Sequence, residues 1–385
     1  MHSQAPIIFL SSKNATFPVR KMLSVPFLLV SSLLLASAVA EEVSPESAPR
    51  QISVTEIQDG YETTFPAMGS TMSIIAYAPN ESQATKAFEE AQQEVERLNS
   101  IMTDYESDSE LNLFVKSSPT PTPLSKDLWN VLVASQSWYQ RTDGAFDASI
   151  GALTRMWRAA RRAKSEPSSD QIARAVSLCG WQHISLDNKT HAGTIDKQEV
   201  KIDLGGIAAG YIIDATFDIM IKHGLSKCLI NAGGDIRCGD SPPGRIGWRI
   251  EIAPLADMPK SETSAGNENN QKLPLRRIHL SNASIVTSGD LWQFYEFNGI
   301  RRSHILDPKT GIGVPGPTVV AVIASKCIDA DAAATAISVM GIKEGMLFAS
   351  LQSDIQAMMV TRDRRTNELQ YRVTDDFPTG IYDPN

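Results

Sequence analysis

Carboxylates stand beside glycine turns at three places in the chain. The three segments are Gly144-Ala145-Phe146-Asp147, Asp203-Leu204-Gly205-Gly206 and Gly233-Gly234-Asp235. Glycine lets the backbone turn sharply or approach a ligand closely, because it has no side chain. Each turn could therefore present a carboxylate and backbone polar groups to the same ligand. Taken singly, each is also an ordinary tight turn.

The second of these turns leads into a helix and is the most informative. Glu199–Ile202 alternates polar and apolar residues as a strand does, and Ile207, Tyr211, Ile212 and Phe217 recur at helical spacing. Backbone N–H groups at a helix N-terminus attract anions. The carboxylate of Asp203 would then lie beside a phosphate site, where two negative charges meet. A metal ion, or a hydrogen bond to the polar edge of a nucleotide, could resolve this conflict. The alternative is a strand–helix turn without a ligand.

A carboxylate and a hydroxyl share one predicted helix face near the C-terminus. Asp331 and Thr335 are four residues apart in a run of small residues, so their oxygens point the same way. Together with a backbone carbonyl from a glycine turn, they would suit a hard cation such as Mg²⁺, which commonly works with substrate phosphates. The alternative is that Asp331 is the N-cap or a first-turn acid of a packing helix.

A histidine and another carboxylate flank a predicted turn, Asp307-Pro308-Lys309-Thr310-Gly311. His304 and Asp307 then lie at a strand end, where His304 could serve as a general base or contact a nucleotide. A half-buried structural histidine is the alternative. Thr287-Ser288-Gly289-Asp290 predicts a similar turn, whose hydroxyls could bind a ligand or could make an ordinary Ser/Thr turn.

Many strands with helices between them must position these groups. We expect two strands in 61–77 broken at Met68-Gly69, an acidic loop at 104–111, and a helix beginning after Ser125. The other expected strands are 225–230, 247–252, 278–280, 283–287, 319–324, 358–361 and 369–373, and the other expected helices are 82–102, one starting at 166–169, 330–340 and 343–351. The order lacks regular βαβ repetition, so the predicted class is α+β, with one domain over 61–385.

Charge narrows the range of partners. The chain has 385 residues and a formal net charge of −8, which argues against nucleic acid as the main partner. One basic run, Arg155–Lys164, contains Trp157, and we interpret it as the solvated face of a helix. The segment 257–272 is polar and without periodicity, which indicates a solvated loop between strands.

The N-terminus has the pattern of a secretory signal peptide over residues 1–40. Lys21 precedes an apolar run, Met22–Leu35, and Ala38-Val39-Ala40 offers a cleavage site, with Met22 as a possible true start. Residues 41–60 then read as a linker. No cysteine follows the apolar run for lipid attachment, so we expect an exported, periplasmic protein without a transmembrane span in its mature form. The alternative is an uncleaved anchor.

The four cysteines are spaced too widely for a zinc site of the Cys-x-x-Cys type. They are Cys179, Cys228, Cys238 and Cys327, and the chain has 6 His. Cys228 and Cys327 lie in apolar, strand-like runs and are expected to be buried thiols.

Seven of these segments, in this order, resemble the ApbE family of flavin transferases (FAD:protein FMN transferases). The matching segments are Met68-Gly69-Ser70-Thr71, Gly144–Asp147, Asp203–Tyr211, Asn231–Asp235, Thr287–Asp290, His304–Gly311 and Asp329–Ala336. The resemblance implies that the protein binds FAD and, with Mg²⁺, transfers FMN through a phosphoester bond to a Thr or Ser of a target flavoprotein, releasing AMP. It also implies targets among exported flavoproteins and subunits of membrane redox pumps.

The resemblance further assigns roles by position. It implies a magnesium site at Gly206, Asp331 and Thr335, and a catalytic role for His304 with Asp307. It implies FAD contacts at Met68, Tyr105, Ala145, Phe146, Asp147, Asp203, Ala209, Ser288, His304 and Ile305. One position departs from the family, which usually carries Lys where this chain has Ala209, so a cation from elsewhere, such as the run Arg155–Arg162, could substitute.

Two other activities fit the same residues. An FAD pyrophosphatase would give the phosphate to water and make FMN and AMP. An exported FAD-binding protein without chemistry would explain the missing Lys at position 209, although the pair Asp331 and Thr335 argues against it, because binding alone does not need the metal.

Overall fold

The computed structural model describes residues 8–9, 53–252, 276–290, 294–297, 300–363, 366, 368–378 and 380. The predicted signal peptide and the predicted loop 257–272 lie outside the described residues, apart from the short strand β1 (Ile8–Phe9). That strand pairs in parallel with Ile250 and Glu251.

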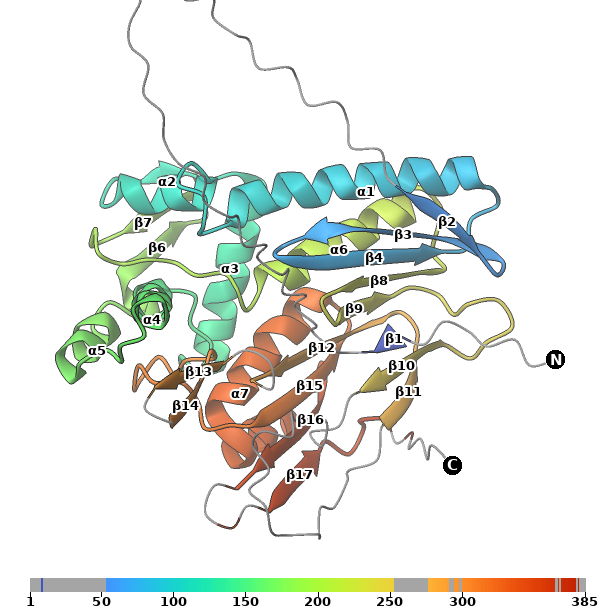
Figure 1. Cartoon of the computed structure of the whole chain (residues 1–385). Helices are drawn as coiled ribbons and strands as arrows, with labels where there is room; N and C mark the ends of the chain where they lie inside the picture. Colours follow the sequence, from blue (N-terminus) through green and yellow to red (C-terminus); the bar gives the residue numbers. More distant parts are fainter. Residues whose placement is uncertain are drawn as a thin grey trace, which may run out of the picture.

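A nine-stranded antiparallel sheet forms the centre of the fold (Figure 1). Its spatial order is β17-β16-β15-β12-β9-β8-β4-β3-β2. The strands are β2 (Val54–Ile57), β3 (Gly60–Ala67), β4 (Ser70–Ala76), β8 (Cys228–Ala232), β9 (Asp235–Cys238), β12 (Ala283–Gly289), β15 (Thr318–Ala324), β16 (Ile355–Arg362) and β17 (Leu369–Val373). Apolar side chains lie on both faces of the sheet, and every residue of β15 is buried.

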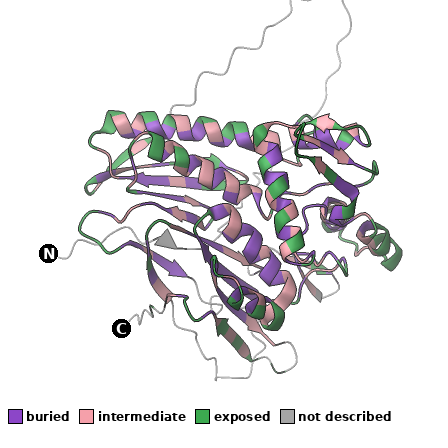
Figure 2. Ribbon diagram, turned by 180° about the vertical axis from the view of Figure 1, so that it is seen from behind, coloured by how far each residue is buried: buried purple, intermediate pink, exposed green. Residues whose placement is uncertain are grey.

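Three helices cover one face of this sheet: α1 (Glu81–Met102), α6 (Ala208–Lys222) and α7 (Cys327–Ser350). Their apolar faces and the sheet enclose the main core, which includes Ile74, Phe88, Ile213, Val322 and Ile337. The other face packs on β10 (Trp248–Ile252) and β11 (Arg276–Leu280), which form a second core with the sheet. Figure 2 shows, from behind, that burial follows these inner faces. The sheet is therefore held rigidly between two layers.

A smaller lobe extends beyond α1. It contains α2 (Glu110–Ser117), α3 (Lys126–Arg141), α4 (Gly151–Ala163), α5 (Ser169–Val176), the 3-10 turn η1 (Trp181–His183), and the short strands β5 (Thr122–Pro123), β6 (Ile184–Asp187) and β7 (Ala192–Ile195). As expected, Ser125 caps α3, and its hydroxyl accepts the N–H of Leu128 at 3.2 Å. The hairpin β13 (Phe294–Phe297) and β14 (Ile300–Ser303) rests on α4, where the rings of Trp157 and Tyr295 stack with centroids 6.3 Å apart.

Helices α6 and α7 are locked together at the start of α7. The carboxylate of Asp214 accepts the N–H groups of Cys327 and Ile328 at 2.9 and 3.0 Å, which caps the helix from its neighbour. A side chain at Gly210 would meet the carbonyl oxygen of Cys327 at 2.5 Å, so the close approach requires glycine. This contact fixes the position of Asp331 relative to α6.

The α+β class is confirmed, as are most of the expected elements. The two helices expected over 330–340 and 343–351 form a single element, α7, interrupted by non-helical backbone at Gly341. Helix α7 begins before Ala330, so Asp331 lies in its second turn and is not an N-cap.

Three details of the sequence prediction were wrong. The strand expected at Glu199–Ile202 is reduced to a single bridge between Lys201 and Ile150, and none of the described strands pairs with it. Thr287 to Gly289 continue β12 and pair with β15 instead of turning. Cys327 begins α7 and does not lie in a strand.

Among the described residues, one helix is long and apolar enough by composition to cross a membrane: α7. Half of its most apolar window is buried within the fold, and the helix packs against β12, β15 and β16. Its composition is accounted for by its place in the core.

Candidate functional site

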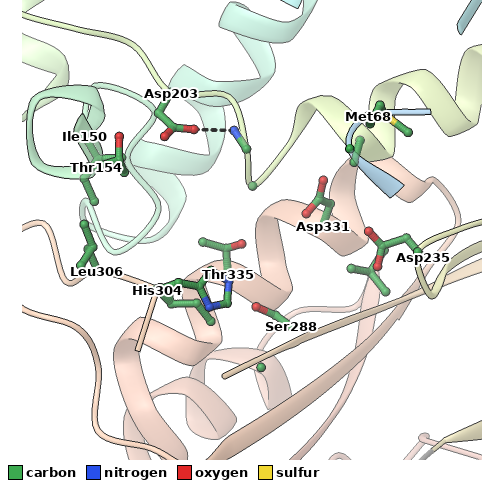
Figure 3. Close-up of a pocket in the computed structure, with 18 of the residues that line it drawn as sticks. Met68, Ile150, Thr154, Asp203, Asp235, Ser288, His304, Leu306, Asp331 and Thr335 are labelled. Atoms are coloured by element: carbon green, nitrogen blue, oxygen red, sulfur yellow. Dashed lines mark hydrogen bonds between the residues drawn. The ribbon is translucent and has the colours of Figure 1, made fainter. Parts of the chain in front are cut away.

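A pocket of about 920 Å³ opens between the smaller lobe and the helix-covered edge of the sheet. Segments far apart in the sequence line it: the β3–β4 turn, the loops after α1 and α3, α4, the start of α6, the β8–β9 turn, β12, β13, the loop after β14, and α7. Figure 3 shows their side chains converging on one cavity. All seven segments that resemble the ApbE family contribute to its lining.

The β3–β4 turn places Met68 at the pocket. Ala67 pairs with Ser70, and the two residues between them have φ of 49° and 71°, as a two-residue hairpin of this type requires. A left-handed backbone is unusual for methionine and costs free energy, and such conformations cluster at functional sites. The β8–β9 turn is built the same way from Gly233 and Gly234, and it leads directly to Asp235.

Asp147 organises the loop that carries Ala145 and Phe146. One carboxylate oxygen accepts the N–H and the hydroxyl of Ser149, and the other accepts the N–H of Gly180 at 2.9 Å. Burial raises the pKa of Asp147, and these hydrogen bonds oppose that shift. Its carboxylate therefore holds the loop while lining the pocket.

A guanidinium joins two carboxylates on the α4 side of the pocket. Arg158 donates to Asp203 at 3.0 Å and to Asp104 at 2.5 Å. Asp203 also accepts the N–H of Gly205 at 2.8 Å, which shapes the turn before α6 (Figure 3). The guanidinium lies over the ring of Tyr105, 4.7 Å from its centroid. The interpretation of this basic run as a solvated face was wrong for Arg158, whose side chain is 27% exposed.

The opposite wall holds two carboxylates without a basic partner. Among the described residues, no ion pair involves Asp235 or Asp331. Asp331 accepts the N–H of Gly210 at 3.1 Å. Burial and mutual repulsion raise the pKa of Asp331, and burial raises that of Asp235. A bound cation would relieve this repulsion.

The predicted magnesium ligands lie next to this acidic wall. A Cβ at Gly206 would meet the hydroxyl of Thr335 at 2.8 Å, so the backbone at Gly206 and the Thr335 side chain are in close contact. Together with Asp331 they offer carbonyl, hydroxyl and carboxylate oxygens, which is the donor set that Mg²⁺ prefers. The residues fit a magnesium ion, although in the described part of the chain no three His, Cys, Asp or Glu side chains gather as a metal site.

The loop after β14 brings His304 to the pocket but not Asp307. His304 and Ile305 line the cavity, as does Ser288 from β12. The carboxylate of Asp307 instead accepts the N–H of Lys309 and the hydroxyl of Thr310, at 2.8 and 2.9 Å. Asp307 thus fixes the turn beside His304.

The structure brings every predicted site residue except Asp307 into the pocket lining, Ala209 included. The lining also includes residues to which the sequence prediction gave no role in the site, among them Thr154 on α4, Tyr295 on β13, and Asp235. The run Arg155–Arg162, named above as a possible substitute for the Lys expected at position 209, contributes Arg158, Arg161 and Arg162. The three arginines have a spacing that places them on one helix face, which was the available signal.

Comparison with known proteins agrees with this geometry. The sequence profile of the ApbE family matches residues 68–359, which is most of the chain and includes all of the segments that line the pocket. The chain belongs to the ApbE family. The predicted family is thereby confirmed.

Individual ApbE relatives match over most of their length. The FAD:protein FMN transferase of Vibrio cholerae is 28% identical over 303 residues, 77% of this chain and 86% of its own. The Escherichia coli K12 protein of the same name is 27% identical, over 66% and 70% of the two chains. The prediction that the chain is an enzyme is confirmed by this family and these relatives.

Solved ApbE structures share the fold. A mutant of the flavin transferase ApbE from Vibrio cholerae superposes with a TM-score of 0.72 at 25% identity, covering 83% of this chain and 99% of the other. The apo flavinyl transferase ApbE from Pseudomonas stutzeri gives 0.69 at 25% identity, over 84% and 96%.

The four cysteines are all buried free thiols. Burial raises the pKa of Cys179 and of Cys228 to about 12, so neither is a ready nucleophile. The burial expected for Cys228 and Cys327 is confirmed.

Proposed function

We propose that the protein transfers FMN from FAD to a Thr or Ser hydroxyl of a target flavoprotein and releases AMP. Membership of the ApbE family supports this, as do relatives named FAD:protein FMN transferase. The observation that carries the proposal is the pocket itself, where His304 lines the same cavity as Gly206, Asp331 and Thr335. A base and a candidate metal site on one cavity suit phosphoryl transfer.

Gly206, Asp331 and Thr335 would hold Mg²⁺. When bound, the ion would neutralise charge on the diphosphate of FAD, which is its usual contribution to phosphoryl transfer. The raised pKa values of Asp235 and Asp331 support a cation at this wall. The protein's own contribution is to keep these oxygens together through the close contact between α6 and α7.

His304 is the proposed base. The acceptor hydroxyl oxygen forms a bond to the phosphorus of the FMN half, and His304 takes its proton. The bond from that phosphorus to the bridging oxygen breaks, and AMP leaves with that oxygen. Asp307 supports this step indirectly, because it fixes the turn that follows His304.

The remaining pocket residues orient FAD. Met68, Tyr105, Ala145, Phe146, Asp147, Asp203, Ala209, Ser288 and Ile305 all line the cavity, and they are the proposed contacts. The volume of about 920 Å³ lies within the range of ordinary ligand sites. Holding FAD in one orientation supplies much of the rate enhancement in reactions of this type.

We also propose that the protein is exported and acts in the periplasm. Support comes from Lys21, the apolar run Met22–Leu35 and the small residues before Glu41. Cleavage there would remove β1, which contributes two residues to the edge of the β10–β11 sheet. Exported flavoproteins and subunits of membrane redox pumps are the proposed acceptors.

One assay tests the proposed function. The protein is incubated with FAD, Mg²⁺ and a flavoprotein domain that carries an acceptor threonine, and in-gel flavin fluorescence and AMP are measured. The same domain with that threonine replaced by alanine is the control. A fluorescent acceptor with AMP supports the transferase. Free FMN with AMP and no label would identify a pyrophosphatase, and unchanged FAD would identify a binding protein.

A further inference from the structure

Three elements of the pocket meet at a single side chain, Arg158. This arginine lies on α4, whereas Asp104 and Tyr105 follow α1, and Asp203 precedes α6. Its two terminal nitrogens are divided between the carboxylates of Asp104 and Asp203. The planar face of the same guanidinium lies over the Tyr105 ring. Arginine can make two directed bonds and one stacking contact at the same time, and lysine cannot.

The two carboxylates need this cation to stay where they are. Their side chains are only 8% and 10% exposed, so water screens them weakly. Burial and the nearby charge of Asp203 both raise the pKa of Asp104, and Arg158 opposes the shift. Without the guanidinium, two loops that carry like charges would repel each other inside the pocket wall.

The ring of Tyr105 depends on the same contact. Tyr105 is 79% exposed, and its backbone N–H donates to the hydroxyl of Thr103. The ring also stacks on the guanidinium of Arg158, 4.7 Å from the ring centroid, and this contact restricts its orientation. Arg158 therefore controls both Tyr105 and Asp203, two of the proposed FAD contacts.

We propose that Arg158 is a positioning residue for FAD: it ties the loops of Tyr105 and Asp203 to α4 and so preforms that wall of the binding site. This inference rests on the proposed function and adds a residue with a defined task to it. Preformed sites bind more tightly because ordering costs are met before the ligand arrives.

The experiment compares FAD affinity, measured by flavin fluorescence, for variants at this cluster. We expect Arg158→Gln to weaken FAD binding on the order of 30-fold. Arg158→Lys should weaken it about 5-fold, since lysine keeps the positive charge but cannot bond both carboxylates with the planar geometry of a guanidinium. At saturating FAD, kcat should fall by no more than about threefold, because His304, Asp331 and Thr335 lie on α7 and after β14, and only Gly206 follows the turn that Asp203 shapes. Arg174→Gln on α5, exposed and outside the pocket lining, is the matched control for loss of one positive charge.

A double variant separates positioning from direct contact. If Arg158 acts by neutralising the two acids, Asp104→Asn combined with Arg158→Gln should recover about fivefold of the lost affinity, because the repulsion is removed. No recovery in the double variant would overturn positioning and indicate direct contact with FAD. Wild-type-like binding by Arg158→Gln would overturn the role altogether.

FAD binding by the wild-type protein distinguishes failure of the Arg158 proposal from failure of the proposed function. FAD binding by the wild type, combined with unaltered binding by Arg158→Gln, would remove the role of Arg158 and leave the proposed function intact. A wild-type protein that does not bind FAD would overturn the proposed function and this role with it. Melting temperatures of all variants, expected to stay within about 4 °C of wild type, exclude general unfolding as the cause.

Discussion

Two pairs of carboxylates lie at the pocket, and the fold stabilises them differently. Asp203, Asp235 and Asp331 line the cavity, and Asp104 pairs with the same arginine as Asp203. Asp104 and Asp203 share the guanidinium of Arg158, so their charge is compensated within the protein. Asp235 and Asp331 share no basic side chain among the described residues. Burial raises the pKa of both, as it does that of Asp104, but only at Asp104 does a described cation oppose the shift. The charge of the first wall is balanced within the protein, whereas the charge of the second would be balanced by the proposed cation. We infer from this difference that the first wall orients FAD and that the second holds the proposed Mg²⁺.

The largest expected effect is at the uncompensated wall. Asp331→Ala removes a proposed magnesium ligand, and we expect transfer of FMN to fall about 1,000-fold, the scale for loss of a main electrostatic contact. Without metal, the variant should melt within about 4 °C of wild type, because loss of the buried carboxyl and loss of its hydrogen bond from the Gly210 N–H have opposite effects on stability. Activity and thermal unfolding are measured together.

The control for this change is Asp329→Ala in the first turn of the same helix. Asp329 accepts the indole N–H of Trp138 at 3.1 Å and does not line the pocket. The Asp329→Ala variant should be less stable than wild type but should transfer FMN at the same rate. Full activity in Asp331→Ala would remove the distinction between the two walls.

The next effect tests the contact that holds the proposed metal ligands together. Gly206→Ala adds a Cβ that would meet the Thr335 hydroxyl at 2.8 Å, so Thr335 must move. We expect Mg²⁺ to be required at roughly 30-fold higher concentration, and the free energy of unfolding to drop by about 1–2 kcal/mol. The Mg²⁺ dependence of transfer measures the first and chemical denaturation the second.

A second change at this contact distinguishes strain from metal binding. Adding Thr335→Ala to Gly206→Ala removes the clash, so stability should return while the Mg²⁺ requirement stays high. Recovery of both properties together would show that Thr335 does not contribute to the metal site.

A third prediction concerns pH. A carboxyl whose pKa is raised on folding holds its proton more tightly in the folded state, so the metal-free protein loses stability as pH rises from the unfolded value, about 4, towards the folded one. For Asp235 the folded pKa is raised to about 7. Mg²⁺ should therefore raise the melting temperature more at pH 8 than at pH 6, by roughly 2–4 °C, in a thermal shift series. An equal shift at both pH values would contradict a cation at this wall.

The smallest expected effect concerns position 209 in α6. Ala209 lines the pocket at the position where the resemblance to the ApbE family led us to expect Lys. We expect Ala209→Lys to tighten FAD binding about fivefold, through one additional cation near the phosphates. Ala209→Met, similar in length but uncharged, is the control in calorimetry. Equal affinities in all three proteins would show that this position does not contact FAD.

The wall that contains Asp331 was predicted from the sequence more fully than the wall that contains Arg158. The spacing of Asp331 and Thr335 and the glycine turn before α6 are local features, so they were readable from the chain. The hairpin at Met68-Gly69 was also readable, because its turn chemistry is local. These residues needed the fold only to bring them together.

The first wall depends on packing between elements distant in the sequence. Arg158 lies 54 residues from Asp104 and 45 from Asp203. The local pattern places Arg158 on one helix face with Arg161 and Arg162, but it does not show that Arg158 pairs with these two carboxylates. The strand expected before Asp203 is missing for the same reason, because strand formation depends on a neighbour to pair with. The role of Asp307 stays a prediction: its carboxylate lies outside the pocket lining and fixes the turn beside His304, and turn formation and catalysis favour the same residue at that position.

The stoichiometry of the reaction tests the central claim most directly. The mature protein is given FAD, Mg²⁺ and an acceptor domain, and the intact mass of the acceptor is measured against the AMP released. We predict one covalently bound FMN per acceptor and one AMP per FMN bound, with neither product formed by Asp331→Ala. AMP released together with free FMN, and an acceptor of unchanged mass, would contradict it.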